Sequence, residues 1–327
     1  PRSTLDRSSA ASDVYKRQAF QICNLFGGEI IETNNSNDQN YLNIDSFGNQ
    51  WGWKRSGDIK DWSKLVIKQS NNKEIFCSQL SGNNLWRNSA AGNTIKHLSD
   101  KDYEKKKSSF HISVFGNHKN TWHPPTLWIG LGCERNTSKE LIEDSLQNFL
   151  TTNNLSPLSI AGFATVDLKK DEQAILEISK EKNLPIKFFT SEELSAINTP
   201  NPSNIVLNEI GTPSVAEAAC ILAAGQGSKL LKEKKIYKST DSSKSTFGAV
   251  TIAVSESINQ YSPLTGEIHV VGSGPGDISY LTNDARKALS KCSIWIGYKM
   301  YLDLIKPLKR KDQVMIESNL TEEKERC

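Results

Sequence analysis

The chain has 327 residues, of which 37% are hydrophobic and 24% are charged. It therefore carries enough apolar residues for a soluble protein of two or more domains. The formal net charge of +3 is too small to indicate nucleic-acid binding, and no apolar stretch is long enough to span a membrane. The six cysteines form no CxxC pair and the five histidines are scattered. The composition therefore predicts a cytoplasmic protein without a disulfide framework and without a metal held by protein ligands.

The N-terminal third is polar and irregular in pattern. Residues 1–18 lack both apolar periodicity and the apolar core of a signal peptide, so we interpret them as a foreign or disordered leader. Helical spacing of apolar residues in 19–34 predicts a helix, a glycine C-cap and a short strand. The apolar runs 65–67 and 74–77 indicate short strands with long polar connections. We therefore expect 19–126 to be a small α+β region.

From residue 127 the sequence alternates between apolar strands and capped helices. The predicted strands are 127–132, 160–166, 184–189, 205–207 and 249–254. The predicted helix caps are Thr137 (with Glu140 completing a capping box), Asp171, Ser191 and Ser214. This order predicts a three-layer α/β domain with a mostly parallel sheet over 127–257. A linker at 258–267 and a new strand at 268–271 then open a second α/β unit over 268–327.

The string GLGCERNTS at 130–138 lies where a strand ends and a helix begins. Ligands of open α/β sheets bind at the carboxyl ends of the strands, and Gly130 and Gly132 would let a ligand approach the backbone closely. The field of the helix N-terminus could lower the pKa of Cys133. The alternative interpretation is a tight turn with a buried cysteine.

Two later strings occupy equivalent positions. In ATVDLKKDE at 164–172, Asp167 and Lys169 follow a strand, and a carboxylate beside an ammonium suits proton transfer or carboxylate binding. The alternative is an ordinary helix cap with solvated charges. In GTPSVAEAA at 211–219, Ser214 is a predicted cap, and Glu217 either completes a capping box or acts as a second acid/base group.

These three strings, in this order and together with LPIKFFTSEEL and a closing GAVTIAVS, resemble the C-terminal domain of the cobalt-precorrin-5A hydrolase family of anaerobic cobalamin synthesis. The resemblance covers 127–255, and residues 19–126 look like the central region and the tail of the N-terminal domain of that family. It implies opening of the lactone of cobalt-precorrin-5A by water, with release of acetaldehyde. Cobalt would then enter only within the corrinoid substrate.

Lactone opening needs a base for water and a donor for the developing oxyanion. The candidate catalytic residues are Asp167, Lys169, Glu172, Glu217 and Cys133, with water attack favoured over a cysteine nucleophile. Gly130, Gly132, Arg135, Thr137 and Ser214 are the candidate substrate-binding residues, because the corrinoid carries many carboxylates.

A fourth string, VVGSGPGDISYLT from residue 270, is followed by a strand ending in GYKMY. It resembles the opening of tetrapyrrole methyltransferases of the precorrin-3B C(17)-methyltransferase type. The resemblance implies S-adenosylmethionine as cofactor and a possible homodimer through this part, and we expect the remainder of the pocket to be missing. The candidate cofactor-binding residues are Gly272, Gly274, Pro275, Gly276 and Asp277.

Two other functional interpretations remain open at this point. The α/β domain could be a non-catalytic tetrapyrrole carrier, or the region before the methyltransferase opening could be only regulatory. We expect a small-molecule corrinoid as the partner, and neither nucleic acid nor a membrane.

Overall fold

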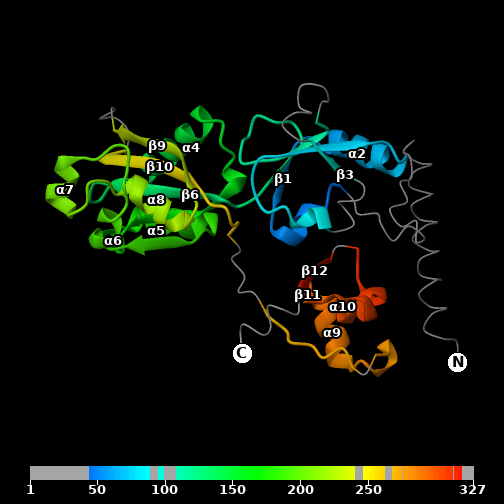
Figure 1. The fold of residues 1–327 in the computed structure, drawn as a ribbon. Coiled ribbons are helices and arrows are strands. Elements are labelled where there is room, and N and C mark those ends of the chain that lie inside the picture. Colours follow the sequence, from blue (N-terminus) through cyan, green and yellow to red (C-terminus); the bar gives the residue numbers. More distant parts are fainter. Residues whose placement is uncertain are drawn as a thin grey trace, which may run out of the picture. The chain divides into compact units, whose positions relative to one another are not determined.

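The structure is a computed structural model, and it describes residues 44–88, 95–98, 108–239, 246–261, 267–274, 276–311 and 313–318. Figure 1 shows its ribbon. The predicted leader at 1–18 and the predicted helix and strand within 19–34 lie outside the described residues. Within those residues, no helix is both long and apolar enough to cross a membrane.

The first part, within residues 44–126, is a five-stranded sheet in the order β1-β5-β4-β2-β3. The strands are β1 (Lys54–Ser56), β2 (Ile75–Gln79), β3 (Ile95–His97), β4 (Phe110–Ile112) and β5 (Thr121–His123). The short helices η1 (Phe47–Trp51) and η2 (Leu85–Asn88) accompany it. Only the β1–β5 pair among these strands is antiparallel. The aromatic core is made of Phe47, Trp62, Trp86, Phe110 and Trp122, all at most 2% exposed.

The predicted strand at 74–77 is confirmed as part of β2, but the predicted strand at 65–67 is wrong. Those residues belong to α2 (Ile59–Ser70), which begins where the side chain of Asp58 accepts a hydrogen bond from the amide of Lys60. The buried positions Trp62, Val66 and Gln69 follow helical spacing, so the apolar run is one face of a helix.

The second part is the α/β domain, whose sheet has the order β8-β7-β6-β10-β9. Its strands are β6 (Leu127–Cys133), β7 (Ile160–Val166), β8 (Ile186–Phe189), β9 (Lys229–Lys238) and β10 (Ala249–Glu256). β6, β7 and β8 are parallel, whereas β10 pairs antiparallel with both β6 and β9. The predicted parallel sheet is therefore confirmed on one side only, because β9 and β10 form an antiparallel pair at the other edge.

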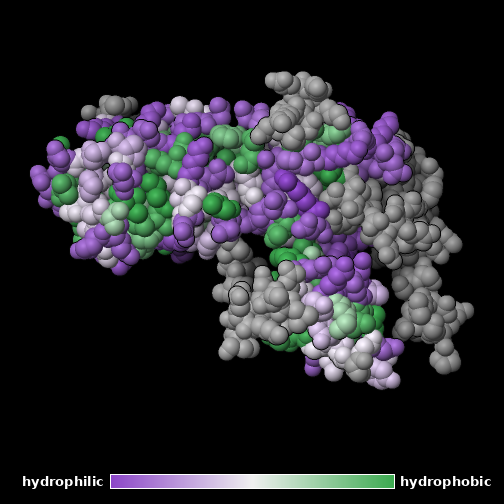
Figure 2. All heavy atoms as spheres, in the orientation of Figure 1, coloured by the Kyte–Doolittle hydropathy of each residue, from purple (hydrophilic) through white to green (hydrophobic). Residues whose placement is uncertain are grey.

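Helices cover both faces of this sheet, which confirms the predicted three layers. Leu127, Ile129 and Leu131 of β6 pack with α4 (Lys139–Thr152) and α5 (Gln173–Lys182). Trp128 points to the opposite face, as alternation along a strand requires, and packs with α6 (Ser191–Ser195) and α8 (Ala216–Ala224). Figure 2 shows hydrophobic residues over the part of the domain where α6 and α8 are drawn.

Several predicted details of this domain are wrong. Residues 205–207 lie in α7 (Asn204–Ile210) and not in a strand. The caps of α4, α5, α6 and α8 each differ by one residue from the prediction. They are Ser138, Glu172, Thr190 and Val215. Only Thr190 among these four accepts a capping hydrogen bond, in a capping box with Glu193.

The third part is a small unit within residues 267–318. It contains η5 (Ile278–Tyr280), α9 (Asn283–Lys291), β11 (Ile294–Tyr298), α10 (Lys299–Ile305), η6 (Lys306–Leu308) and β12 (Val314–Ser318). β11 and β12 are parallel and pack with α9 and α10 around Trp295. The predicted strand at 268–271 is not formed, and Ile268 and Val270 are 94% and 99% exposed.

Candidate functional site

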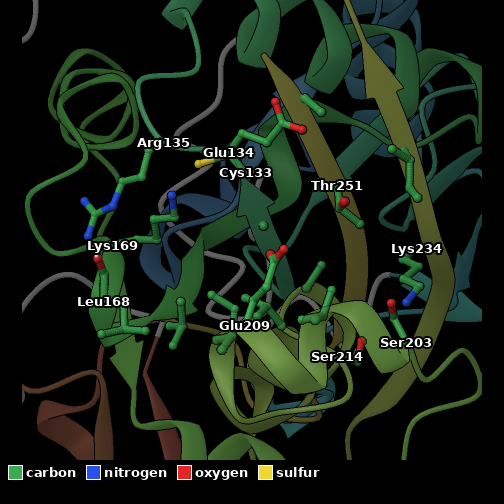
Figure 3. A pocket seen from close by; sticks show the side chains of 18 of the residues that line it. Cys133, Glu134, Arg135, Leu168, Lys169, Ser203, Glu209, Ser214, Lys234 and Thr251 are labelled. Atoms are coloured by element: carbon green, nitrogen blue, oxygen red, sulfur yellow. Dashed lines mark hydrogen bonds between the residues drawn. The ribbon is translucent and has the colours of Figure 1, made fainter.

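The α/β domain contains a cavity of about 510 Å³ where β6 and β7 end. Its walls come from the loop after each strand, from α7, from the start of α8 and from β9 and β10. Figure 3 shows the side chains that line it. The charged lining residues are Glu134, Arg135, Lys169, Glu209, Lys234 and Lys238. The cavity therefore lies at the sheet edge where strand topology predicts a ligand.

The glycines of the first string have different roles. A Cβ on Gly130 would lie 1.8 Å from the carbonyl oxygen of Ala216, so this glycine lets α8 pack directly on β6. Gly132 lines the cavity, and the nearest atom to its added Cβ is 3.7 Å away, in Thr251. Of the two predicted ligand-contacting glycines, only Gly132 is at the cavity.

Lys169 is the most enclosed cation of the cavity. Its Nζ lies 3.3 Å from Oε2 of Glu172, and the two side chains are 7% and 4% exposed. Lys169 lies in the 3-10 turn η4 (Asp167–Lys169) and Glu172 at the N-cap of α5. The turn between β7 and α5 thus buries an ion pair with its cation on the cavity wall. Glu172 faces Lys169 from behind and is not a lining residue.

Arg135 lies on the same side of the cavity as Lys169 (Figure 3). Its guanidinium donates at 2.6 Å to Oδ1 of Asp171 and at 2.6 Å to the carbonyl oxygen of Leu168, and it lies 3.8 Å from Glu172. The hydrogen bond from Arg135 is the main cause that lowers the pKa of Asp171. Arg135 is 53% exposed, so part of its guanidinium remains open to a ligand.

Cys133 ends β6 and lines the cavity. Burial raises the pKa of its thiol to about 11, although the neighbouring Lys169 ammonium acts in the opposite direction. The expectation that a helix N-terminus would lower this pKa is therefore wrong. The loss of solvation outweighs the nearby positive charges, and the group is a neutral thiol at neutral pH.

The other predicted catalytic carboxylates are not at the cavity. Glu217 is fully buried in α8 and accepts hydrogen bonds from neighbouring segments. Asp167 begins η4 and is absent from the cavity lining. The structure thus brings together Lys169, Glu172, Cys133 and Arg135, and leaves Asp167 and Glu217 outside this group.

The hydroxyls of Thr137 and Ser214, two predicted substrate-binding residues, form hydrogen bonds within the protein. Thr137 is buried, and its Oγ1 donates to the carbonyl oxygens of Glu134 at 2.8 Å and Ala249 at 3.2 Å. Ser214 lines the cavity but caps no helix, because its Oγ donates to Glu217 at 3.3 Å. Thr137 therefore holds the loop after β6 against β10, and Ser214 alone of the two is at the cavity wall.

Sequence reasoning missed one wall of the cavity. Ser203 and Glu209 come from α7 or its cap, and Lys234 and Lys238 come from β9. Figure 3 draws Lys234 and Ser203 on the side opposite Arg135 and Lys169. The density of lysines in 229–238 was the available signal, because an exposed edge strand is typically protected by charge.

The glycine-rich string of the third part is an exposed loop. Gly274 and Gly276 have φ of +73° and +119°, a region that favours glycine. A Cβ on Gly272 or Gly276 would meet no atom within 4 Å. Hydrogen bonds from the side chain of Ser279 and from its amide, the latter at 2.7 Å, lower the pKa of Asp277. Pro275 lies outside the described residues.

Comparison with known proteins finds relatives of the domain that contains the cavity. Residues 127–255 match the protein family described as Cobalamin synthesis G C-terminus. Protein CobE of Sinorhizobium sp is 32% identical over 110 residues, which are 33% of this chain and 71% of CobE. The chain belongs to this Cobalamin synthesis G C-terminus family. The resemblance of the three strings is thereby confirmed at the level of the family.

Two further relatives extend the comparison. Cobalt-precorrin-5A hydrolase of Priestia megaterium is 27% identical over 223 residues, 63% of this chain and 58% of that protein. The chain thus spans a little over half the length of this relative. Cobalt-factor III methyltransferase of the same organism is 38% identical over 64 residues, which are 20% of this chain and 12% of that enzyme. The homology to cobalt-precorrin-5A hydrolases is therefore broad, and the match to a methyltransferase is short.

Proposed function

We propose that the chain acts in cobalamin biosynthesis as a cobalt-precorrin-5A hydrolase, with the cavity of its α/β domain as the active site. The observation that carries the proposal is the charge of the cavity wall. Arg135, Lys169, Lys234 and Lys238 line it from both sides. A corrinoid with many carboxylates would meet these cations at the sheet edge, and such charge-assisted contacts are strong. The Priestia relative named for this activity supports the same assignment.

Within this proposal the residues around Lys169 stabilise the developing oxyanion. Water adds to the acyl carbon of the lactone, and the ring C–O bond breaks to give a carboxylate and a hydroxyl. That hydroxyl then loses its proton and collapses to an aldehyde as the neighbouring C–C bond breaks, so the two-carbon unit leaves as acetaldehyde, and the macrocycle takes up the electron pair and a proton. Lys169 and Arg135 are lining cations whose charge acts on Cys133 at the end of β6, and the neutral Cys133 thiol is a donor rather than a nucleophile. Preorganised donors of this kind supply a large part of acyl-transfer catalysis.

The proton of the attacking water needs an acceptor on the cavity wall. Among the described residues, the lining carboxylates are Glu134 and Glu209. Both are exposed, so a water molecule can reach them. We assign the base to one of these two residues, and replacing each by Gln identifies which.

The test is aldehyde release from cobalt-precorrin-5A by the purified chain, followed through the consumption of NADH by a coupled alcohol dehydrogenase. We expect acetaldehyde in amounts equal to the substrate consumed. The Lys169→Met variant should lower kcat about a hundredfold, as expected for loss of one oxyanion donor. The exposed Lys170, which is not a lining residue, gives the matched control Lys170→Met, which should keep full activity. Absence of aldehyde from the unaltered chain would refute the hydrolase assignment.

A carrier function is the second candidate, and one observation favours it. Glu172 and Glu217, the buried carboxylates beside the cavity, are both engaged with protein partners. A carrier would bind the corrinoid without releasing aldehyde. If the chain binds cobalt-precorrin-5A but releases no acetaldehyde, the carrier function is supported over the hydrolase function.

We propose that residues 267–318 correspond to the opening of an S-adenosylmethionine-dependent methyltransferase of the C(17) type. The short match to cobalt-factor III methyltransferase supports this. The exposed loop around Gly272 and Gly276 offers no enclosed site among the described residues, so the residues present do not fit the cofactor and we derive no methyl-transfer step. Titration calorimetry of S-adenosylmethionine into the chain should show no binding. Light scattering tests the proposed homodimer through this part.

A further inference from the structure

We infer that Glu217 is a positioning residue, whose carboxylate holds the wall of the cavity formed by α7 and β9 and thereby sets the affinity for the ligand. The inference rests on the proposed function for the identity of the substrate alone. The geometry of the wall is independent of it.

The carboxylate of Glu217 is 0% exposed and accepts four hydrogen bonds. Oε1 accepts from Nδ2 of Asn201 at 2.9 Å and from the amide of Lys234 at 3.0 Å. Oε2 accepts from the amide of Asn201 at 3.3 Å and from Oγ of Ser214 at 3.3 Å. A carboxylate offers about four lone-pair sites, so these partners saturate it and no site remains to take a proton from water.

The four donors belong to three segments that line the cavity. Asn201 precedes α7, Ser214 precedes α8, and Lys234 lies in the middle of β9. The side chain of Lys234 also donates to the carbonyl oxygen of Asn201, which reinforces the same junction. Glu217 is therefore the common acceptor for the segments that supply Ser203 and Lys234 to the cavity.

The wall depends on this junction because α7 has little packing of its own. None of the residues of α7 is fully buried, and its contacts with the core come from the half-buried Val206 and Ile210. Among the remaining hydrogen bonds of its ends are those from the amide of Ser203 to Pro213 at 2.8 Å and from Oγ of Ser191 to Ile210 at 2.6 Å. A helix with few buried contacts opens at low free energy, so loss of the Glu217 bonds should loosen 200–213 before it affects the sheet.

The decisive substitution is Glu217→Gln, which keeps the size of the side chain. An amide group must present a donor to at least one of the amide donors that now face a carboxylate oxygen, and a buried donor without an acceptor is costly. Glu140 is the matched control. It occupies the same second position of its helix as Glu217 does, and it is exposed. Asn201→Ala is a milder second variant, because it removes the Nδ2 hydrogen bonds to Glu217 and Glu233 and leaves the Glu217 carboxylate in place.

The experiment combines hydrogen exchange with kinetics on the full chain. In Glu217→Gln we expect faster amide exchange in 200–213, a KM for cobalt-precorrin-5A raised about tenfold and a kcat within about twofold. Asn201→Ala should change the amide exchange rate and the KM in the same direction by smaller factors. If Glu217→Gln does not fold, Asn201→Ala tests the positioning role in its place. Glu140→Gln should change neither.

Two results would overturn the positioning role. A fall in kcat with unchanged KM would make Glu217 part of the chemistry, and unchanged exchange in 200–213 would show that it does not hold the wall. If the unaltered chain releases no aldehyde, the proposed hydrolase function fails, while the exchange comparison and the binding constant of the pigment still test Glu217.

Discussion

The Lys169→Met substitution tests two roles of the ion pair between Lys169 and Glu172. One is the stability of the α/β domain, and the other is binding of the ligand in the cavity. The substitution removes the cation and leaves the Glu172 carboxylate buried, at 4% exposure. Among the described residues, Arg135 is the cation that remains near Glu172; its Nη1 is 3.8 Å away and its side chain is 53% exposed. We therefore expect the α/β domain to lose stability and the cavity to lose its most enclosed positive charge.

The magnitude follows from the burial of the pair. Removing one partner of a buried ion pair costs about 3–5 kcal/mol. Arg135 compensates part of the remaining negative charge, so the cost should be near the lower end, about 3 kcal/mol. Replacing both partners by apolar residues, as in Lys169→Met with Glu172→Leu, removes both desolvation penalties. The double variant should return to within about 1 kcal/mol of the original stability.

The assay is native-state hydrogen exchange of the amides of β6 and β7 in the full chain, since a chain of several domains does not unfold in one step. The two single variants and the double variant form a cycle, whose coupling energy should be about 2 kcal/mol or more. The double variant should nevertheless bind cobalt-precorrin-5A as weakly as the Lys169→Met variant does. A coupling energy below about 0.5 kcal/mol, or full binding by the double variant, would refute this account of the pair.

Three further predictions follow from single positions. Gly130→Ala should lower the free energy of unfolding by about 3 kcal/mol, because its Cβ would overlap the backbone of α8. Gly132→Ala should change that free energy by no more than about 0.5 kcal/mol. Hydrogen exchange of the β6 amides compares the two variants. Alkylation of Cys133 by iodoacetamide, mapped by mass spectrometry, should be slow at pH 8 and should accelerate as the pH rises toward the thiol pKa of about 11. Rapid alkylation at pH 7 would contradict the burial of this thiol. Burial, aided by a neighbouring histidine, lowers the pKa of His111 to about 4, so the stability contributed by its neutral form is complete above pH 6.5 and is lost as pH falls through 4. NMR titration of its ring should show that midpoint, and a midpoint near 6.5 would show an exposed ring.

The order of elements in the α/β domain could be predicted because each strand and helix carries its own local signal. β6 and β7 are apolar runs with definite ends, and α4 between them and α5 after β7 have helical spacing of apolar residues. These signals depend on neighbours in the sequence. The position of the cavity then followed from strand topology, because parallel strands end at one edge of the sheet.

The sequence-based predictions were wrong where the structure depends on residues far apart in the chain. Ile205, Val206 and Leu207 have strand propensity, but in α7 they lie at the cavity wall or in solvent. β9 is a strand through its pairing with β10, although its lysines are depleted in strands. Predicting the role of Glu217 would have required Asn201 and Lys234, which are 16 and 17 residues away in the chain.

The distribution of charge around the cavity limits where acid/base chemistry can occur. Glu172 neutralises Lys169 from behind and Glu217 is saturated by hydrogen bonds, so both carboxylates serve the architecture of the wall. The cations face the cavity from both sides, and Leu168 and Ile236 also contribute apolar surface to the wall. Under the proposed function, this wall would meet the apolar ring and the peripheral carboxylates of the corrinoid. In the proposed hydrolysis, the proton acceptor would then come from the exposed lining carboxylates Glu134 and Glu209. Glu134 lies between Cys133 and Arg135 in the sequence, the two residues that would meet the oxyanion. On this reasoning Glu134→Gln should lower kcat more than Glu209→Gln does, and the opposite order would move the chemistry to the α7 wall.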